Sequence, residues 1–258
     1  MRFRVAEHGS EQAIDRAHNM KTTKLIFFAV LAFSCSAVTA QTVTITPKKT
    51  IYRRPKPEVD FKRTFTVRRP VAKAATPALS RKITLAISPE KVLELNIREE
   101  MGESQWLEEA DYKVLFNQNG VLCIEQWMTG TAAYPDSSTK RVVVDIAKGV
   151  TVLPAVVFKD LPAFAKLVKK SQDAEIAAAK KEMKSDPDAN PEELFEQANF
   201  TPDDFTEFSV DANGVTIYYD YGFPHVLEAL QPSGEYHFTW MEIKQFVRAD
   251  GLLARFVR

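Results

Sequence analysis

Two Asn-Gly pairs, at residues 119–120 and 213–214, each lie between runs in which apolar and polar residues alternate. The run before the first pair, Tyr-Lys-Val-Leu-Phe over residues 112–116, has the two-residue period of a half-buried strand. An Asn-Gly pair readily adopts the positive φ angles of a tight hairpin turn. The sequence therefore predicts two antiparallel hairpins, over residues 111–128 and 205–221.

Helix start signals and apolar runs predict the other elements. Ser88 and Asp160 are typical N-cap residues, and a proline follows each within two residues. The expected helices cover residues 89–101, 161–183, 191–198 and 240–247, and the expected strands cover residues 141–146, 150–158 and 235–239. Runs of strands with helices apart from them indicate an α+β fold, with a mainly antiparallel sheet and a few segregated helices.

The N-terminal region has the order of a secretory signal peptide. Lys21 and Lys24 precede an apolar run over residues 25–33, and small or weakly polar residues fill 34–40. We expect residues 20–40 to be a cleaved signal peptide and the mature protein to be extracytoplasmic, either periplasmic or secreted. The apolar run is shorter than the roughly 20 residues that span a bilayer, so we expect no transmembrane span after cleavage.

Met20 is the expected start of translation, and residues 1–19 are the expected mis-called extension. An uncleaved anchor and a lipoprotein acylated at Cys35 are the alternatives to a cleaved signal. If Cys35 leaves with the signal, Cys123 is the one cysteine of the mature chain, and no internal disulfide can form. A mature chain of about 218 residues (258 minus 40) is long enough to be held together by its core.

The formal net charge of zero hides two regions of opposite sign. Residues 41–82 contain 12 Lys and Arg against 2 acidic residues, or +10, with five prolines and no glycine. Residues 83–258 contain 17 basic and 29 acidic residues, or −12. We therefore expect a basic, proline-containing arm or linker over 41–82, followed by an acidic α+β domain. The arm either contacts an anionic surface or is a solvated linker that neutralises its own domain.

Motifs for common chemistries do not occur in the sequence. There is no glycine-rich phosphate loop, no Cys-x-x-Cys and no Gly-x-Ser-x-Gly. The two histidines of the mature chain, His225 and His237, lack ligand-spaced partners, and Cys123 lies in an apolar run typical of a buried thiol. We therefore predict no catalytic residue, no metal site and no cofactor. An exported chain is also not expected to bind nucleic acid.

The most unusual segment is Tyr-Tyr-Asp-Tyr-Gly-Phe-Pro-His over residues 218–225. Aromatic side chains with polar tips suit recognition surfaces. An ordinary strand with one packed and one solvated face is the alternative interpretation. The residues that we predict to bind a partner are Tyr219, Tyr221, Phe223, His225 and Trp240.

The same region carries a resemblance to a known family. A phenylalanine-rich strand, a glycine turn, an aromatic strand, a Pro-His pair, a further strand and a short helix follow one another, as Phe205, Phe208, Gly214, Val215, Ile217, Tyr219, Tyr221, Pro224, His225, Gly234, Phe238, Trp240, Glu242 and Ile243. Residues 112–161 are similar to the upstream hairpin and helix start of that family. The pattern resembles an extracytoplasmic bacterial domain of unknown function, found at the C-terminus of a lysozyme-sensing anti-sigma factor and of some polysaccharide deacetylases.

The resemblance and the acidic charge together suggest a function. We expect a non-enzymatic exported binding domain for an envelope protein or glycan, with a basic, lysozyme-like protein as one candidate partner. An envelope hydrolase that acts through a carboxylate pair or Cys123 is one alternative. A wall-associated structural protein held by its basic arm is another.

Overall fold

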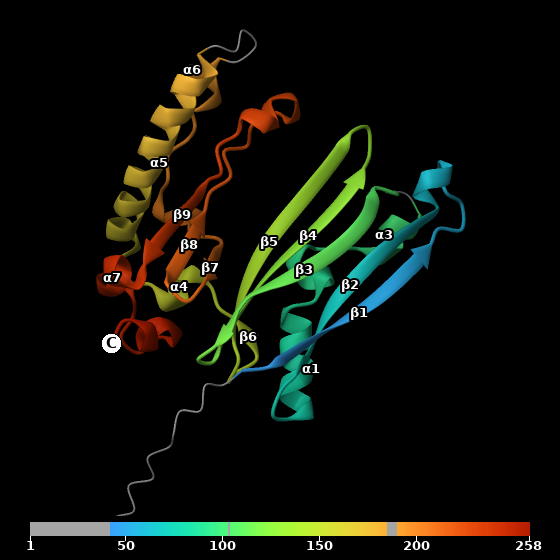
Figure 1. Cartoon of the computed structure of the whole chain (residues 1–258), viewed down its shortest axis with the longest axis horizontal. Coiled ribbons are helices and arrows are strands. Elements are labelled where there is room, and N and C mark those ends of the chain that lie inside the picture. Colours follow the sequence, from blue (N-terminus) through green and yellow to red (C-terminus); the bar gives the residue numbers. More distant parts are fainter. Residues whose placement is uncertain (1–41, 103, 185–189) are drawn as a thin grey trace, which may run out of the picture. The chain divides into compact units, whose positions relative to one another are not determined.

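The computed structural model of the protein describes residues 42–102, 104–184 and 190–258 (Figure 1). The predicted extension and signal peptide, residues 1–40, lie outside this part of the chain. Among the described residues, no helix combines the length and the apolar character that a membrane span requires.

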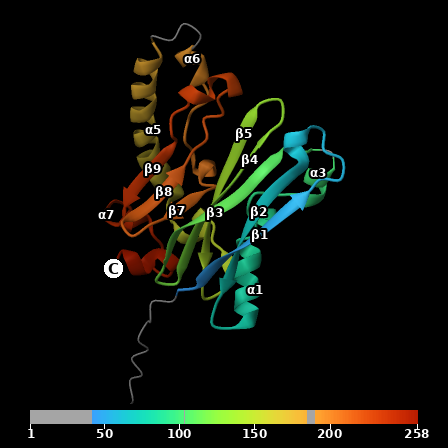
Figure 2. The same ribbon diagram turned by 45° about the vertical axis from the view of Figure 1, so that its right-hand side comes forward.

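A large sheet of six strands is arranged in chain order (Figures 1 and 2). All neighbouring strands are antiparallel except β2 and β3, which pair in parallel at Thr66 and Val67. The strands are β1 (Thr44–Arg53), β2 (Thr64–Lys73), β3 (Leu107–Gln118), β4 (Val121–Thr131), β5 (Pro135–Asp145) and β6 (Val150–Thr151).

The expected basic arm is wrong for residues 44–73, because β1 and β2 form a hairpin at one end of the large sheet. Strand β2 alternates buried and less buried residues, and Phe65 and Val67 are fully enclosed. The prediction of an arm rested on the net charge of the segment and did not take this alternation into account. Arg68 and Arg69 form ion pairs with Asp111 at 2.7 Å and Glu90 at 2.6 Å. Two arginines of this segment thus neutralise acidic residues of the same domain.

Arg54 fixes the hairpin most firmly. Its side chain is 0% exposed and its guanidinium lies 4.6 Å from the ring centre of Phe65. Its nitrogens donate to the carbonyl oxygens of Glu100, Lys62 and Leu107, each at 2.7 Å, and to the Glu100 carboxylate at 3.2 Å. A buried guanidinium with this many acceptors holds β1 and β2 to the start of β3.

Helix α1 (Pro77–Ala86) crosses one face of the large sheet (Figure 2). The single helix expected over residues 89–101 is instead two short helices, α2 (Pro89–Val92) and α3 (Ile97–Met101). Glu94 has a φ of 55°, which a continuing right-handed helix does not allow. The break turns Leu93 and Leu95 into a core cluster with Phe65 and Leu107 of the sheet.

The first predicted hairpin is confirmed by β3 and β4, with φ of 51° at Asn119 and 75° at Gly120. The second hairpin also forms, as β7 (Phe208–Val210) and β8 (Gly214–Tyr218), but its turn differs. A Cβ at Gly214 would lie 1.9 Å from the Phe238 carbonyl oxygen, so glycine is needed there for close strand approach.

The small sheet has the order β7, β8, β9, with β9 at Glu235–Thr239 as predicted. The predicted long helix is α5 (Leu161–Met183), and the Asp160 carboxylate accepts the Ala163 N–H at its N-terminus. Phe164 of this helix stacks on Phe246, with ring centroids 5.0 Å apart, and lies edge-on to Phe238 of β9, with ring centroids 5.7 Å apart. The small sheet and α5 therefore share one aromatic core.

Shorter elements complete the chain. The strand expected over 150–158 ends at Thr151, because Pro154 lacks an N–H and begins α4 instead. The other elements are the helices α4 (Pro154–Val157), α6 (Pro191–Leu194) and α7 (Trp240–Ile243), and the 3₁₀ turns Asp60–Arg63, Pro202–Asp204, His225–Leu230, Lys244–Phe246 and Leu252–Phe256. The predicted α+β class, with a mainly antiparallel sheet, is confirmed.

Replacement of Arg54 tests whether residues 42–82 belong to the domain. Arg54→Ala leaves the Glu100 carboxylate buried without its cation, so we expect a loss of about 3–5 kcal/mol in the free energy of unfolding. Arg53→Ala is the matched control, because Arg53 is exposed, and its cost is expected within about 0.5 kcal/mol. Urea denaturation measures both. Equal stability of the two variants would contradict the integration of this segment.

Candidate functional site

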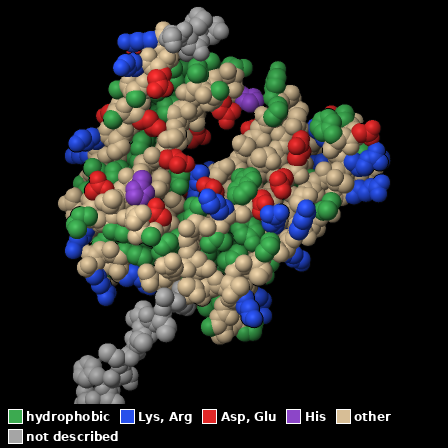
Figure 3. Space-filling view, viewed as in Figure 1, with side chains coloured by type: hydrophobic (Ala, Val, Ile, Leu, Met, Phe, Trp, Pro, Cys, Tyr) green, Lys and Arg blue, Asp and Glu red, His purple; other side chains and the backbone are tan. Residues whose placement is uncertain are grey.

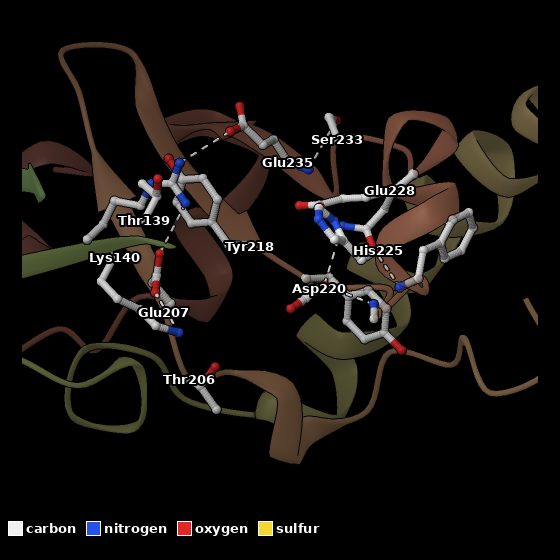
Figure 4. Close-up of a pocket in the computed structure, with 15 residues that line it drawn as sticks. Thr139, Lys140, Thr206, Glu207, Tyr218, Asp220, His225, Glu228, Ser233 and Glu235 are labelled. Carbon is white, nitrogen blue, oxygen red and sulfur yellow. Dashed lines mark hydrogen bonds and ion pairs between the residues drawn. The ribbon is translucent and has the colours of Figure 1, made fainter. Parts of the chain in front are cut away.

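A polar cleft of about 450 Å³ lies between the large sheet and the segment that joins β8 to β9. Figure 3 shows this side of the protein hollowed between the β4–β5 hairpin and the segment after β8. In Figure 4, Asp220, His225 and Glu228 lie across the open centre from Glu207 and Tyr218. The lining residues are Thr139, Lys140, Arg141, Thr206, Glu207, Tyr218, Tyr219, Asp220, Gly222, Phe223, His225, Glu228, Gln231, Ser233 and Glu235.

Arg141, on β5, is the central charged group of the cleft. Its guanidinium binds Glu125 at 2.8 Å, Glu207 at 3.2 Å and Glu235 at 3.6 Å. It also lies 4.0 Å from the ring centre of Tyr218. These contacts join β4 and β5 of the large sheet to β8 and β9 of the small sheet. They also neutralise Arg141, so its charge is not free for an anionic ligand.

Glu207 is a half-buried carboxylate of the cleft. Burial raises the pKa of its carboxyl above the usual range, and the nearby Arg141 acts in the opposite direction. Its carboxylate also accepts a hydrogen bond from the Arg141 guanidinium at 3.2 Å. Glu207 is therefore held as a hydrogen-bond acceptor against the edge of β5.

The upper rim of the cleft is an aromatic contact between distant segments. Tyr134, in the turn between β4 and β5, is 68% exposed, and its ring centroid lies 5.8 Å from that of His225. The Nδ1 atom of His225 lies 3.0 Å from a carboxylate oxygen of Glu228. Four carboxylates line the cleft against two cations, so its formal charge is −2 with histidine neutral.

Glu175, on α5, holds the far wall in place. Its carboxylate accepts hydrogen bonds from Tyr221 at 2.9 Å, Tyr236 at 2.8 Å, Ser233 at 2.8 Å and the Gly234 N–H at 3.2 Å. These donors belong to the segment between β8 and β9 and to β9 itself. One carboxylate thus fixes the segment that carries the polar residues of the cleft.

Three of the five predicted binding residues line the cleft, namely Tyr219, Phe223 and His225. His225 is exposed, whereas the Phe223 ring packs in a small core with Phe195 and Met183. The structure therefore brings part of the predicted set to one surface. Whether these residues bind a partner stays a prediction.

The other two predicted residues lie elsewhere. Tyr221 is half-buried and directs its hydroxyl to Glu175 and to Tyr236. Trp240 stacks on Phe256 with centroids 4.6 Å apart, and its Nε1 donates to the Ala212 carbonyl. Both side chains are engaged in the packing of the domain.

Sequence reasoning missed the large-sheet wall of the cleft. Arg141 and Glu207 are 66 residues apart, and neither stands in a motif. The apolar, β-branched run over residues 141–146 predicted only that Arg141 lies at the start of a strand. Tyr218 was within the aromatic segment, but its stacking against Arg141 depends on how the two sheets meet.

Cys123 does not line the cleft. Cys123 is 0% exposed and burial raises the pKa of its thiol to about 12, so the thiol is protonated at neutral pH. Within the described ranges, no three His, Cys, Asp or Glu side chains are grouped to hold a metal ion.

A six-stranded, mostly antiparallel sheet packed on a small second sheet and one long helix defines this α+β protein. Compared by sequence, the chain matches no protein-family model. No curated protein matches it either. The comparisons that found a match are therefore those of structure.

Two solved structures are similar to this chain. One is a DUF3298 family protein from Pseudomonas aeruginosa PAO1, with a TM-score of 0.54 and 13% identity over 81% of this chain and 94% of that one. The other is a member of the DUF3298 family from Bacteroides fragilis, with a TM-score of 0.52 and 11% identity over 84% and 97%. The chain thus has the fold of DUF3298 proteins, a domain of unknown function. The resemblance to the anti-sigma factor and the deacetylases stays a prediction.

The tyrosines bound to Glu175 predict a loss of stability at alkaline pH. Burial and the hydrogen bonds to Glu175 raise the pKa of Tyr236 and of Tyr221 in the folded protein, whereas an unfolded tyrosine titrates near 10. The folded state then holds more protons than the unfolded state above about pH 10, so stability falls as pH rises. Urea midpoints between pH 8 and pH 11 should fall less steeply for Tyr236→Phe than for the wild type. Parallel curves would contradict the role of this hydroxyl.

Proposed function

We propose that the protein is an exported, non-enzymatic binding domain whose cleft takes a basic protein of the cell envelope. The observation that carries the proposal is the charge pattern of the cleft. Arg141 is bound to three carboxylates, and Asp220 and Glu228 remain on the opposite wall without a Lys or Arg partner among the described residues. Such a surface attracts a cation and repels an anion.

The polar groups of the cleft also suit recognition rather than catalysis. Glu207 and Glu235 both lie against Arg141, and Asp220 accepts the Gly222 N–H at 2.9 Å. These carboxylates are held by local partners and do not converge on a common point as an acid and a base would. The buried, protonated Cys123 thiol supports the same choice over a hydrolase.

A glycan is the alternative ligand for this cleft, since hydroxyls and aromatic rings also bind sugars. The net negative charge favours a basic protein, because a neutral oligosaccharide gains nothing from it. The family resemblance points to a lysozyme-like protein, which is often basic. Lysozyme is therefore the first probe, and chitotetraose is the glycan probe.

The test is calorimetry of the mature chain, residues 41–258, with hen lysozyme at low and moderate salt. Asp220→Asn with Glu228→Gln removes two charges from the cleft, and we expect Kd to rise roughly 10-fold, or about 1.4 kcal/mol. Higher salt should weaken binding of the wild type by screening. Asp220→Asn keeps the oxygen that accepts the Gly222 N–H, so the local turn is preserved.

The matched control removes two exposed carboxylates elsewhere, by Glu108→Gln with Glu109→Gln on β3. Both double variants change the net charge equally, so equal weakening would mean that the overall charge, and not the cleft, attracts lysozyme. The absence of lysozyme binding at low salt, or binding of chitotetraose alone, would contradict the proposed partner.

A further inference from the structure

One wall of the cleft is formed by β5, and β6 pairs with only two residues on the edge of β5 away from β4. We propose that the cleft takes its basic partner as an extended strand, added to β5 by backbone hydrogen bonds. This inference rests on the proposed function and specifies how the partner binds. It requires a strand edge with free backbone groups, room beside that edge and a matching charge.

The backbone of β5 is paired on one side along its whole length. Strand β4 pairs with all of β5, whereas β6 pairs only with Val144 and Asp145. On the side away from β4, the Val143 carbonyl accepts the Val152 N–H. Residues 139, 141 and 143 therefore direct their backbone groups outward, because the direction alternates along a strand.

Thr139 presents the free part of this edge. Its backbone N–H and C=O have no hydrogen-bond partner among residues 42–102, 104–184 and 190–258, and the same holds for the Arg141 carbonyl. The register with β4 continues without a bulge from Val121 to Thr131. A regular strand edge with unpaired groups is a template for another strand.

The opposite edge of the large sheet differs, because β1 contains Pro47 and two lysines in succession. Prolines and lysines are common devices that prevent a strand edge from pairing. Strand β5 contains one lysine, Lys140, and its ammonium group lies 3.9 Å from the Glu207 carboxylate, which neutralises its charge. The edge within the cleft is therefore the less protected of the two.

The cleft provides both space and charge for an added strand. Thr139, Lys140 and Arg141 line it, and its volume of about 450 Å³ extends to Asp220 and Glu228 on the other wall. A strand paired with β5 would run about 4.8 Å from it and point alternate side chains to each face. Lysine or arginine at alternate positions would face the carboxylates. An extended basic segment fits these conditions, and a sugar chain lacks the repeating amide groups.

The first experiment uses a probe that meets these conditions, acetyl-Lys-Thr-Lys-Thr-Lys-Thr-Lys-amide. NMR titration of the mature chain should show slower exchange of the Thr139 amide hydrogen in the presence of the peptide, by roughly 10-fold. A peptide of the same sequence with N-methyl groups on its threonines, which removes backbone donors without changing charge, should bind roughly 10-fold more weakly. Equal binding of the two peptides, or no binding at millimolar concentration, would overturn the proposal.

Thr139→Pro tests the same edge from the protein side. It removes the outward N–H at a position where a strand edge tolerates proline, and the peptide affinity should fall roughly 10-fold. Ile51→Pro is the matched control on β1. Pro47 faces Pro70, and neither residue has an N–H to donate across the pair, so the backbone groups of Pro47 point away from β2. Ile51 is four residues further along β1, so its backbone groups point in the same direction. Ile51 is also 64% exposed, and its variant should bind the peptide as the wild type does.

Lysozyme titration of Thr139→Pro separates this inference from the proposed function. Lysozyme binding that Thr139→Pro leaves unchanged, but that the loss of Asp220 and Glu228 charges weakens, would overturn strand addition and keep the acidic cleft as the binding surface. Peptide protection of the Thr139 amide without lysozyme binding would support strand addition and contradict the lysozyme-like partner. If Thr139→Pro fails to fold, the N-methylated peptide decides the question.

Discussion

Burial of β4 on both of its faces is the constraint on which the rest of the structure depends. Leu122 and Ile124 face the cluster around helix α1, whereas Val121 and Cys123 face the aromatic core of α5 and the small sheet. A strand covered on both sides needs apolar residues at consecutive positions, and Val-Leu-Cys-Ile supplies them. The two layers that cover the sheet are therefore held in place by one strand.

This burial ends before the far ends of β4 and β5, and the cleft begins there. Val142 and Val143 are buried, but Thr139 and Lys140 are partly or fully exposed. Beyond the shared core, the two sheets meet through the contacts of Arg141 with Glu207, Glu235 and Tyr218. The change from apolar to charged residues along β5 thus turns a packed interface into an open polar surface.

Local signals predicted the elements that local interactions stabilise. The Asn119-Gly120 turn and the helix that begins after Asp160 depend only on neighbouring residues. The turn forms where it was predicted, and the helix has the predicted bounds. The hairpin of residues 44–73 was missed because its partners are distant. Arg54 reaches Leu107, 53 residues away, and a count of charges cannot show which of them will be paired. The apolar residues Phe65 and Val67, which alternate with threonines, were the one sequence feature that indicated a strand here.

The same reasoning applies to the candidate site, where sequence identified one wall and not the other. The aromatic segment 218–225 is conspicuous by composition. The sequence does not show which of its residues pack in the core and which lie at the surface, because this depends on the hydrogen bonds to the distant Glu175. An arginine in a cleft, taken alone, suggests an anionic ligand. Arg141 has three carboxylates around it, so its charge is neutralised and the cleft as a whole has a negative formal charge. The sign of the cleft is thus a property of how the two sheets meet, which no single segment of the sequence encodes.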